Sequence, residues 1–150
     1  MNKENIIIRN ANKRDIKSIF KLVKELAIYE NALDKVIVDA EYYKKEWEKN
    51  TFYAIVAEYG KKVIGTCIYY MTFSTWKGRC IYLEDFVVQE KYRKLGVGQL
   101  LYDQLLIESK AKDATMIRWQ VLDWNEPAIK FYKKNDATID KEWWNCKVYF

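Results

Sequence analysis

The sequence contains no histidine and only one proline, five glycines and three cysteines among its 150 residues. The absence of histidine removes most nucleophile–histidine and metalloenzyme chemistries. The cysteines, Cys67, Cys80 and Cys146, are odd in number and lack CxxC spacing, which argues against a disulfide framework or a zinc site. We therefore expect a cytoplasmic protein, in a reducing compartment, without a bound metal.

Long apolar runs and linker-like segments are also missing. No apolar run approaches the ~18 residues of a membrane span, and the start of the chain, MNKENIIIRN, does not resemble a signal peptide. With so little Gly and Pro and no internal repeat, no interdomain linker is expected. Half of the residues are hydrophobic and 16% are aromatic, which suits a packed core. We predict a single domain over residues 1–150 that does not associate with a membrane.

The net charge of +5 is spread over the chain. Lysine and arginine alternate with apolar residues, as in KRDIKSIFKLVKE, which is typical of the solvated face of a helix. A nucleic-acid binder would gather basic and aromatic residues on one face, and no such clustering is present. A modest positive field does suit a cofactor that carries phosphate.

Hydrophobic periodicity predicts an α/β (α+β) fold with a mixed, mostly antiparallel central sheet and helices on both faces. Asn12, with Asp15 three residues later, is a predicted N-cap for a helix that ends near Tyr29. The other predicted helices cover residues 39–49, 98–110 and 125–134. The predicted strands cover residues 5–9, 52–58, 63–73, 80–88, 115–122, 137–140 and 145–150, of which 52–88 form an antiparallel meander.

A glycine-containing loop, YRKLGVGQ at residues 92–99, lies between a predicted strand and a predicted helix. Its two glycines let the backbone approach a ligand, and the helix N-terminus together with Arg93 and Lys94 favours a pyrophosphate. A Walker A loop is excluded because Gln99 follows the last glycine, and a Rossmann fingerprint is excluded by Leu101. Taken alone, the GxG pattern fits a merely flexible loop equally well.

A second motif, WNEPAIKFY at residues 124–132, places Asn125 as an N-cap and Pro127 in the first helical turn. Ala128 and Tyr132 then share one helix face. In isolation this is a capped helix with an aromatic stripe. In combination with the upstream loop it favours a cofactor site.

The two motifs together resemble the acetyl-CoA site of the GNAT superfamily of N-acetyltransferases. More narrowly, YLEDFVV at residues 82–88 and ELAIYE at residues 25–30 resemble the diamine (spermidine/spermine) and thialysine acetyltransferase group. The resemblance runs from about Ile8 to the C-terminus. It implies a GNAT-like fold, acetyl-CoA as acetyl donor and a small-molecule amine as substrate. It also implies a homodimer, to which the aromatic stretch at residues 143–150 could contribute.

The resemblance also implies roles for individual residues. Backbone groups of one strand would hold the pantetheine arm of acetyl-CoA, and the glycine-containing loop would hold its pyrophosphate. Asn125 would also contact the cofactor. The strand positions are Phe86, Val87 and Val88, and the loop positions are Arg93, Lys94, Leu95, Gly96, Val97, Gly98 and Gln99. Tyr132 would act as general acid near the thioester sulfur, and Glu84 as base through water. The positions that would line the amine site are Tyr29, Glu30, Ser74, Asp85 and Glu142.

Acid–base chemistry makes a carboxylate base reasonable. An alkylamine with a pKa near ~10.4 is protonated at neutral pH, and freeing its lone pair costs roughly 4 kcal/mol. Glu84 and Asp85 are adjacent in a strand rich in apolar residues, so buried carboxylates there need a partner. Strand alternation sends the two side chains to opposite faces unless a bulge intervenes.

Two positions depart from the pattern of the group. Asp136 stands where many relatives have glycine, but Asp tolerates the left-handed conformation better than most residues. Ser74 stands where polyamine-acetylating relatives tend to carry Asp. The missing carboxylate favours a thialysine- or lysine-like amine, or a short diamine, over long polyamines.

Two other functions remain open from the sequence. A protein or peptide N-acetyltransferase would need an open groove, whereas the acidic and aromatic set around Glu84 favours a small cation. A non-catalytic acetyl-CoA-binding module would keep the loop and Asn125, but it would not need both Glu84 and Tyr132.

Overall fold

A five-stranded sheet forms the centre of the computed structural model, which describes residues 5–150. Contacts divide the chain into two compact units, one that ends at Trp119 and one that comprises Gln120–Phe150. The sheet belongs to the first unit, and its strands lie side by side in chain order. They are β1 (Ile6–Asn10), β2 (Tyr53–Tyr59), β3 (Lys62–Ser74), β4 (Gly78–Val88) and β5 (Met116–Arg118). Neighbouring strands are antiparallel except β4 and β5, which are parallel. The predicted mixed, mostly antiparallel sheet is confirmed.

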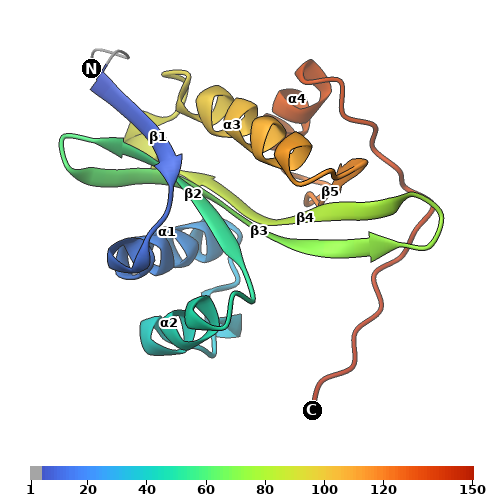
Figure 1. Cartoon of the computed structure of the whole chain (residues 1–150), viewed down its shortest axis with the longest axis horizontal. Coiled ribbons are helices and arrows are strands. Elements are labelled where there is room, and N and C mark those ends of the chain that lie inside the picture. Colours follow the sequence, from blue (N-terminus) through green and yellow to red (C-terminus); the bar gives the residue numbers. More distant parts are fainter. Residues whose placement is uncertain (1–4) are drawn as a thin grey trace. The chain divides into compact units, whose positions relative to one another are not determined.

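Helices cover both faces of this sheet, as predicted (Figure 1). On one face lie α1 (Ile16–Tyr29) and α2 (Ala40–Glu48), and on the other lies α3 (Val97–Ala111). Two separate apolar clusters result, because successive side chains of each strand point to opposite faces. The α1-side cluster includes Ile16, Ile19, Ala54, Val56 and Ile68. The α3-side cluster includes Ile55, Tyr69, Leu83, Leu101 and Leu105.

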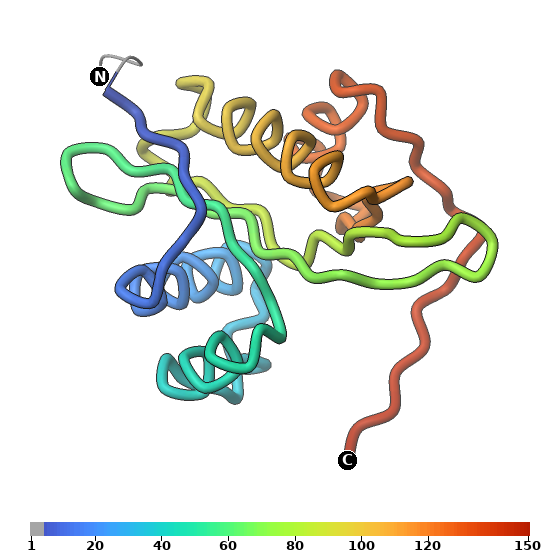
Figure 2. Tube along the Cα trace, viewed as in Figure 1, coloured from blue at the N-terminus to red at the C-terminus, as the bar shows by residue number. Residues whose placement is uncertain are grey.

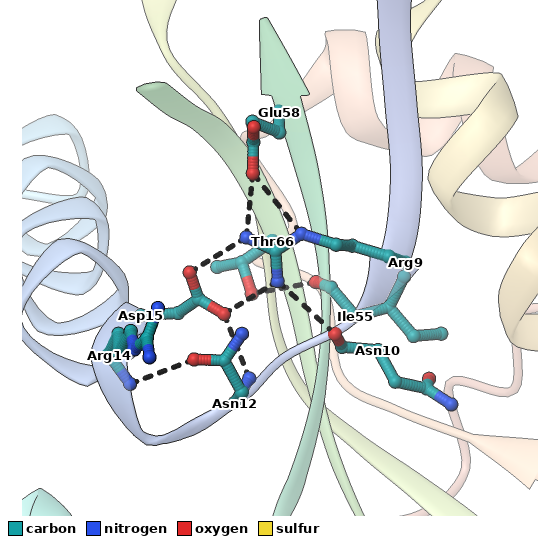
Figure 3. A network of polar contacts seen from close by, with 8 residues as sticks. All are labelled: Arg9, Asn10, Asn12, Arg14, Asp15, Ile55, Glu58 and Thr66. Carbon is teal, nitrogen blue, oxygen red and sulfur yellow. Dashed lines mark hydrogen bonds and ion pairs between the residues drawn. The ribbon is translucent and has the colours of Figure 1, made fainter. Parts of the chain in front are cut away.

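The entry to α1 is held by a polar network (Figure 3). The Asn12 side chain accepts from the Arg14 amide, and the Asp15 carboxylate accepts from the Asn12 amide at 2.8 Å, which confirms the predicted cap. The capped turn is a short 3₁₀ segment, η2 (Lys13–Asp15). The Arg9 guanidinium donates to both oxygens of Asp15, at 2.7 and 2.9 Å, and to Glu58. This arginine therefore ties β1 to β2 and to the start of the helix.

Strands β3 and β4 form a long hairpin that is easily followed along the chain (Figure 2). The hydroxyl of Ser74 accepts from the amides of Trp76 and Lys77 and so closes the turn. Two further 3₁₀ segments, η3 (Leu33–Lys35) and η4 (Glu90–Tyr92), lie in the loops that lead to α2 and α3. Among residues 5–150, no helix is long and apolar enough to cross a membrane.

The second unit contains one helix, α4 (Glu126–Lys134). Asn125 caps it as predicted, since its side chain accepts from the Ala128 amide, and the chain leaves it through Asp136 at a φ of 59°. The prediction of strands at residues 137–140 and 145–150 is wrong, because these segments join no β-ladder. The strand predicted at residues 115–122 is shorter than expected, ending at Arg118. Both errors have one cause: a strand forms only where a partner supplies hydrogen bonds, and apolar alternation alone does not reveal the partner.

Candidate active site

The β3–β4 pairing is interrupted by a β-bulge at Glu84. Ile68 of β3 pairs with Asp85, but the next residue, Tyr69, pairs with Leu83, so Glu84 has no opposite residue. The bulge shifts the alternation of β4 by one position. Leu83 belongs to the α3-side core, whereas Asp85 lies opposite Ile68 of the α1-side core. Strand alternation would have placed Glu84 and Asp85 on opposite faces unless a bulge intervened. The bulge is present, so both carboxylates point to the α1 side of the sheet.

Further contacts place Glu84 on that same face. Glu84 accepts a hydrogen bond from the Tyr70 hydroxyl at 3.1 Å. Tyr70 follows Tyr69, whose side chain is buried in the α3-side core, so Tyr70 points to the face that carries α1 and α2. The charges of Glu84 and Asp85 both raise the pKa of Tyr43 of α2, the helix that lies on this face.

A third carboxylate, Glu30 at the end of α1, completes what we call the acidic cluster: Glu30, Glu84 and Asp85. Burial raises the pKa of Asp85 to about 7, and the charges of Glu84 and Glu30 add to that effect. Burial also raises the pKa of Glu30. The half-buried Asp85 has no hydrogen-bond partner among the described residues. Such a group is poorly solvated and repelled by like charges, so a cation that binds here would favour its ionised form.

The predicted phosphate loop joins the end of β4 to the start of α3. Arg93 donates from Nε to the carbonyl of Val88 at 2.9 Å, and its guanidinium lies 4.9 Å from the centre of the Tyr29 ring. Its side chain therefore fixes the loop to β4 and α1. Lys94 and Gly96 adopt left-handed conformations, with φ of 60° and 86°.

The start of α3 leaves backbone donors facing the loop. Gly96 is the N-cap and provides no side-chain cap, and the N-terminus of a helix carries a partial positive charge that favours an anion. The side chain of Val97 is buried in the core, which leaves only its backbone for a ligand. Left-handed turns that lead into a helix N-terminus form a concave donor set that suits an anion such as a pyrophosphate.

The remaining predicted residues lie in several places. Phe86, Val87 and Val88 pair with Cys67, Thr66 and Gly65 in the sheet. Ser74 lies at the far end of β3, where its hydroxyl serves the turn. Asn125, Tyr132 and Glu142 belong to the second unit. There Tyr132 is buried and Glu142 is exposed, and the Glu142 amide donates to Asp140.

Sequence reasoning missed two tyrosines that border the acidic cluster. Tyr43 lies in the polar helix α2, where nothing in the local sequence distinguishes it from its neighbours. Burial raises the pKa of Tyr43 to about 12, and the charges of Asp85 and Glu84 add to that effect. Tyr70 was one aromatic residue of an apolar strand. Only the pairing of β3 with β4 brings its hydroxyl to Glu84, and no local pattern carries that information.

Within residues 5–150 no group of three or more cysteine, aspartate or glutamate residues is arranged to hold a metal ion. The chemistry available to the site is that of carboxylates, phenols and backbone donors.

Comparison with known proteins identifies the family of the chain. Residues 19–136 match the model of the acetyltransferase (GNAT) family. A thialysine N-epsilon-acetyltransferase of Bos taurus is 35% identical over 94% of this chain and 90% of its own length. A human spermidine/spermine N(1)-acetyltransferase-like protein 1 is 32% identical over 87% of this chain and 20% of its own length. A solved structure of a predicted acetyltransferase with acetyl-CoA from Clostridium acetobutylicum superposes with a TM-score of 0.76, at 20% identity over 95% of this chain and 96% of that one.

Proposed function

Because the chain belongs to the acetyltransferase (GNAT) family, we propose that it transfers the acetyl group of acetyl-CoA directly to a primary amine of a small cationic substrate. One observation carries this proposal. The bulge at Glu84 turns two adjacent carboxylates to the same face of the sheet, where Glu30 joins them. A cluster of this charge favours an ammonium group and disfavours an anionic or apolar substrate.

The donor set between β4 and α3 is where acetyl-CoA would be held. The left-handed Lys94 and Gly96 and the uncapped start of α3 fit its pyrophosphate, with Arg93 keeping the loop in place. The end of β4, Phe86 to Val88, would offer backbone groups to the pantetheine arm, and Asn125 a further contact. Acetyl-CoA supplies an acetyl thioester that is open to attack by a neutral amine.

Binding of the amine and its deprotonation are separate tasks for the acidic cluster. Near neutral pH Asp85 is partly protonated, since its pKa is about 7. An arriving ammonium would favour the ionised carboxylate, so we expect amine binding to release a proton from Asp85. Glu84, which is exposed to water, would then accept the ammonium proton through a water molecule. Freeing the lone pair of the amine costs roughly 4 kcal/mol at neutral pH.

The last step needs an acid. Attack on the thioester creates an oxyanion, which a backbone amide of β4 would stabilise. The departing thiolate takes a proton, and Tyr132 is the proposed donor because a phenol with a pKa near ~10 can protonate a thiolate. The nitrogen of the tetrahedral adduct, which still carries one proton too many for an amide, gives that proton to the Tyr132 phenolate. Glu84 returns its own proton to solvent, so both groups end the cycle as they began it.

The side chain of Ser74 is the basis for the proposed preference among amine substrates. Its hydroxyl accepts two backbone hydrogen bonds of the hairpin turn, and it carries no charge with which to bind a distal ammonium. This supports a thialysine- or lysine-like amine, or a short diamine, over a long polyamine. The Bos taurus relative is named for thialysine, which agrees with that choice.

We further propose a single acetyltransferase domain that acts as a cytoplasmic homodimer. The family match extends across both units of the chain, from residue 19 to 136. Exposed aromatic side chains of the second unit, Trp143, Trp144, Tyr149 and Phe150, are candidates for the interface. Sedimentation of the purified protein would test the dimer.

The deciding experiment is thiol release from acetyl-CoA with a panel of acceptors: thialysine, lysine, short diamines, spermidine and a peptide with a free N-terminus. We expect the highest kcat/KM with thialysine, lysine or a short diamine. A preference for spermidine would overturn the argument from Ser74, a preference for the peptide would overturn the small-amine assignment, and no turnover with any acceptor would favour a binding module.

A further inference from the structure

A pair of stacked tyrosines lies directly beside Glu84. Tyr70 of β3 and Tyr82 of β4 are opposite residues of the ladder, and their rings stack at 5.3 Å with 24° between their planes. The stack lies one step of the ladder from the bulge, since only the pair of Tyr69 and Leu83 stands between them. The Tyr70 hydroxyl donates to the Glu84 carboxylate, with 3.1 Å between Oη and Oε2.

Glu84 has little else to hold it. It is exposed, it is the unpaired residue of the bulge, and among the described residues Tyr70 is its hydrogen-bond donor. A glutamate side chain that is free to rotate samples many rotamers, and fixing it in one of them costs conformational entropy. A base that acts through water needs its carboxylate at a defined place, because proton transfer depends on hydrogen-bond distance.

Tyr70, in contrast, is well held. Its half-buried ring is fixed by the stack on Tyr82. The Arg118 guanidinium of β5 lies 5.9 Å from the Tyr82 ring and donates to Thr72 of β3 at 3.0 Å. Arg118 of β5 thus contacts one ring of the stack and is anchored to β3. Burial, followed by the charge of Glu84, raises the pKa of Tyr70 to about 12, so its hydroxyl remains a donor at every pH used in an assay.

We propose that Tyr70 is a positioning residue that holds the Glu84 carboxylate in the orientation in which it serves as base. This inference rests on the proposed role of Glu84. It predicts that loss of one hydroxyl, with no loss of the ring or the stack, slows the chemical step while both substrates bind as before.

The test compares Tyr70→Phe with a matched control, Tyr82→Phe. Both variants keep the aromatic pair and lose one hydroxyl, but only Tyr70 is bonded to Glu84. We expect Tyr70→Phe to lower kcat at least about tenfold, the low end of the range for loss of one hydrogen bond to a charged group. The KM values for amine and acetyl-CoA should change less than about twofold, and Tyr82→Phe should change kcat less than about twofold. Thermal melts of both variants report whether the fold is kept.

A double-mutant cycle with Glu84→Gln separates positioning from a general structural role. If Tyr70 acts through Glu84, Tyr70→Phe has no further effect on kcat once the base is removed. An equal loss of kcat in both backgrounds, or a kcat for Tyr70→Phe within twofold of wild type, would overturn the inference.

The same cycle distinguishes failure of this inference from failure of the proposed function. If Glu84→Gln lowers kcat strongly and Tyr70→Phe does not, only the positioning role is wrong. If Glu84→Gln leaves kcat and its pH dependence unchanged, the base assignment is wrong, and the role of Tyr70 falls with it.

Discussion

Replacing Asp85 with asparagine should stabilise the fold at neutral and alkaline pH. The side chain keeps its size, but it no longer carries a charge that burial, Glu84 and Glu30 all disfavour. The pKa of Asp85 is raised from 3.8 to about 7. Each pH unit of such a difference corresponds to about 1.4 kcal/mol, so ionised Asp85 costs the fold up to about 4 kcal/mol, or about 2–3 kcal/mol if solvent partly screens it.

The sign of the pH dependence follows from proton binding. Between pH 3.8 and about 7 the unfolded chain loses the Asp85 proton while the folded chain keeps it, so the free energy of unfolding falls as the pH rises. Above about pH 7 both states are ionised and the full cost is present. The advantage of Asp85→Asn should therefore grow from pH 4 to pH 7 and then remain constant.

Urea denaturation of wild type and Asp85→Asn between pH 4.5 and 8.5 measures this advantage directly. A matched control is Asp34→Asn, which makes the same change at an exposed aspartate of η3. If the advantage of Asp85→Asn is independent of pH, or equals that of Asp34→Asn, Asp85 is not the perturbed group that the structure indicates. The variant should also bind the amine more weakly, because the carboxylate that the ammonium would ionise is gone.

Four further predictions concern catalysis, cofactor binding and stability. Tyr132→Phe should lower kcat by about 10²-fold or more while the Kd for acetyl-CoA stays nearly unchanged; an unchanged kcat would remove Tyr132 as the acid. Glu84→Gln should shift the pH profile of kcat/KM toward higher pH, since only amine deprotonated in bulk water would then react; a profile identical to wild type would indicate another base. Gly96→Ala should destabilise the protein by about 1 kcal/mol, because φ of 86° strains an L-residue, and calorimetry should show weaker acetyl-CoA binding; unchanged affinity would argue against a role for this loop. Arg9→Met should lower the free energy of unfolding by about 2–3 kcal/mol at pH 7, because it leaves the Asp15 carboxylate buried without its cation. Arg9 lowers the pKa of Asp15, so the stability that the pair contributes is present above about pH 4 and is lost as Asp15 becomes protonated. The difference in free energy of unfolding between wild type and Arg9→Met should therefore shrink below about pH 4, and a difference that stays constant in urea titrations would contradict the pairing.

Local signals in the chain were sufficient for most of the secondary structure. The Asn12–Asp15 cap, the helical spacing of Ile16, Ile19 and Phe20, and the turn before Lys62 are contained within a few residues. Capping, helical periodicity and turn chemistry are short-range effects, so one sequence reveals them. The glycine loop and its following helix were recognised for the same reason, and so was the family.

Long-range pairing decided the rest. Whether Glu84 and Asp85 share a face depended on one extra residue in β4 opposite Ile68 and Tyr69, and bulges are set by pairing between strands. The pKa of Asp85 depends on burial and on Glu30, which is distant in sequence. The strands predicted at residues 137–140 and 145–150 were wrong because alternation of apolar residues does not supply a partner.

The sequence by itself therefore determined the helices, the first four strands, the family and the identity of the charged residues, since these follow from local chemistry. Only the tertiary structure decided how the acidic cluster is assembled and that the Tyr70 hydroxyl donates a hydrogen bond to Glu84. The physical reason is that side-chain direction in a sheet changes with a register shift of a single residue, which is a property of two strands together.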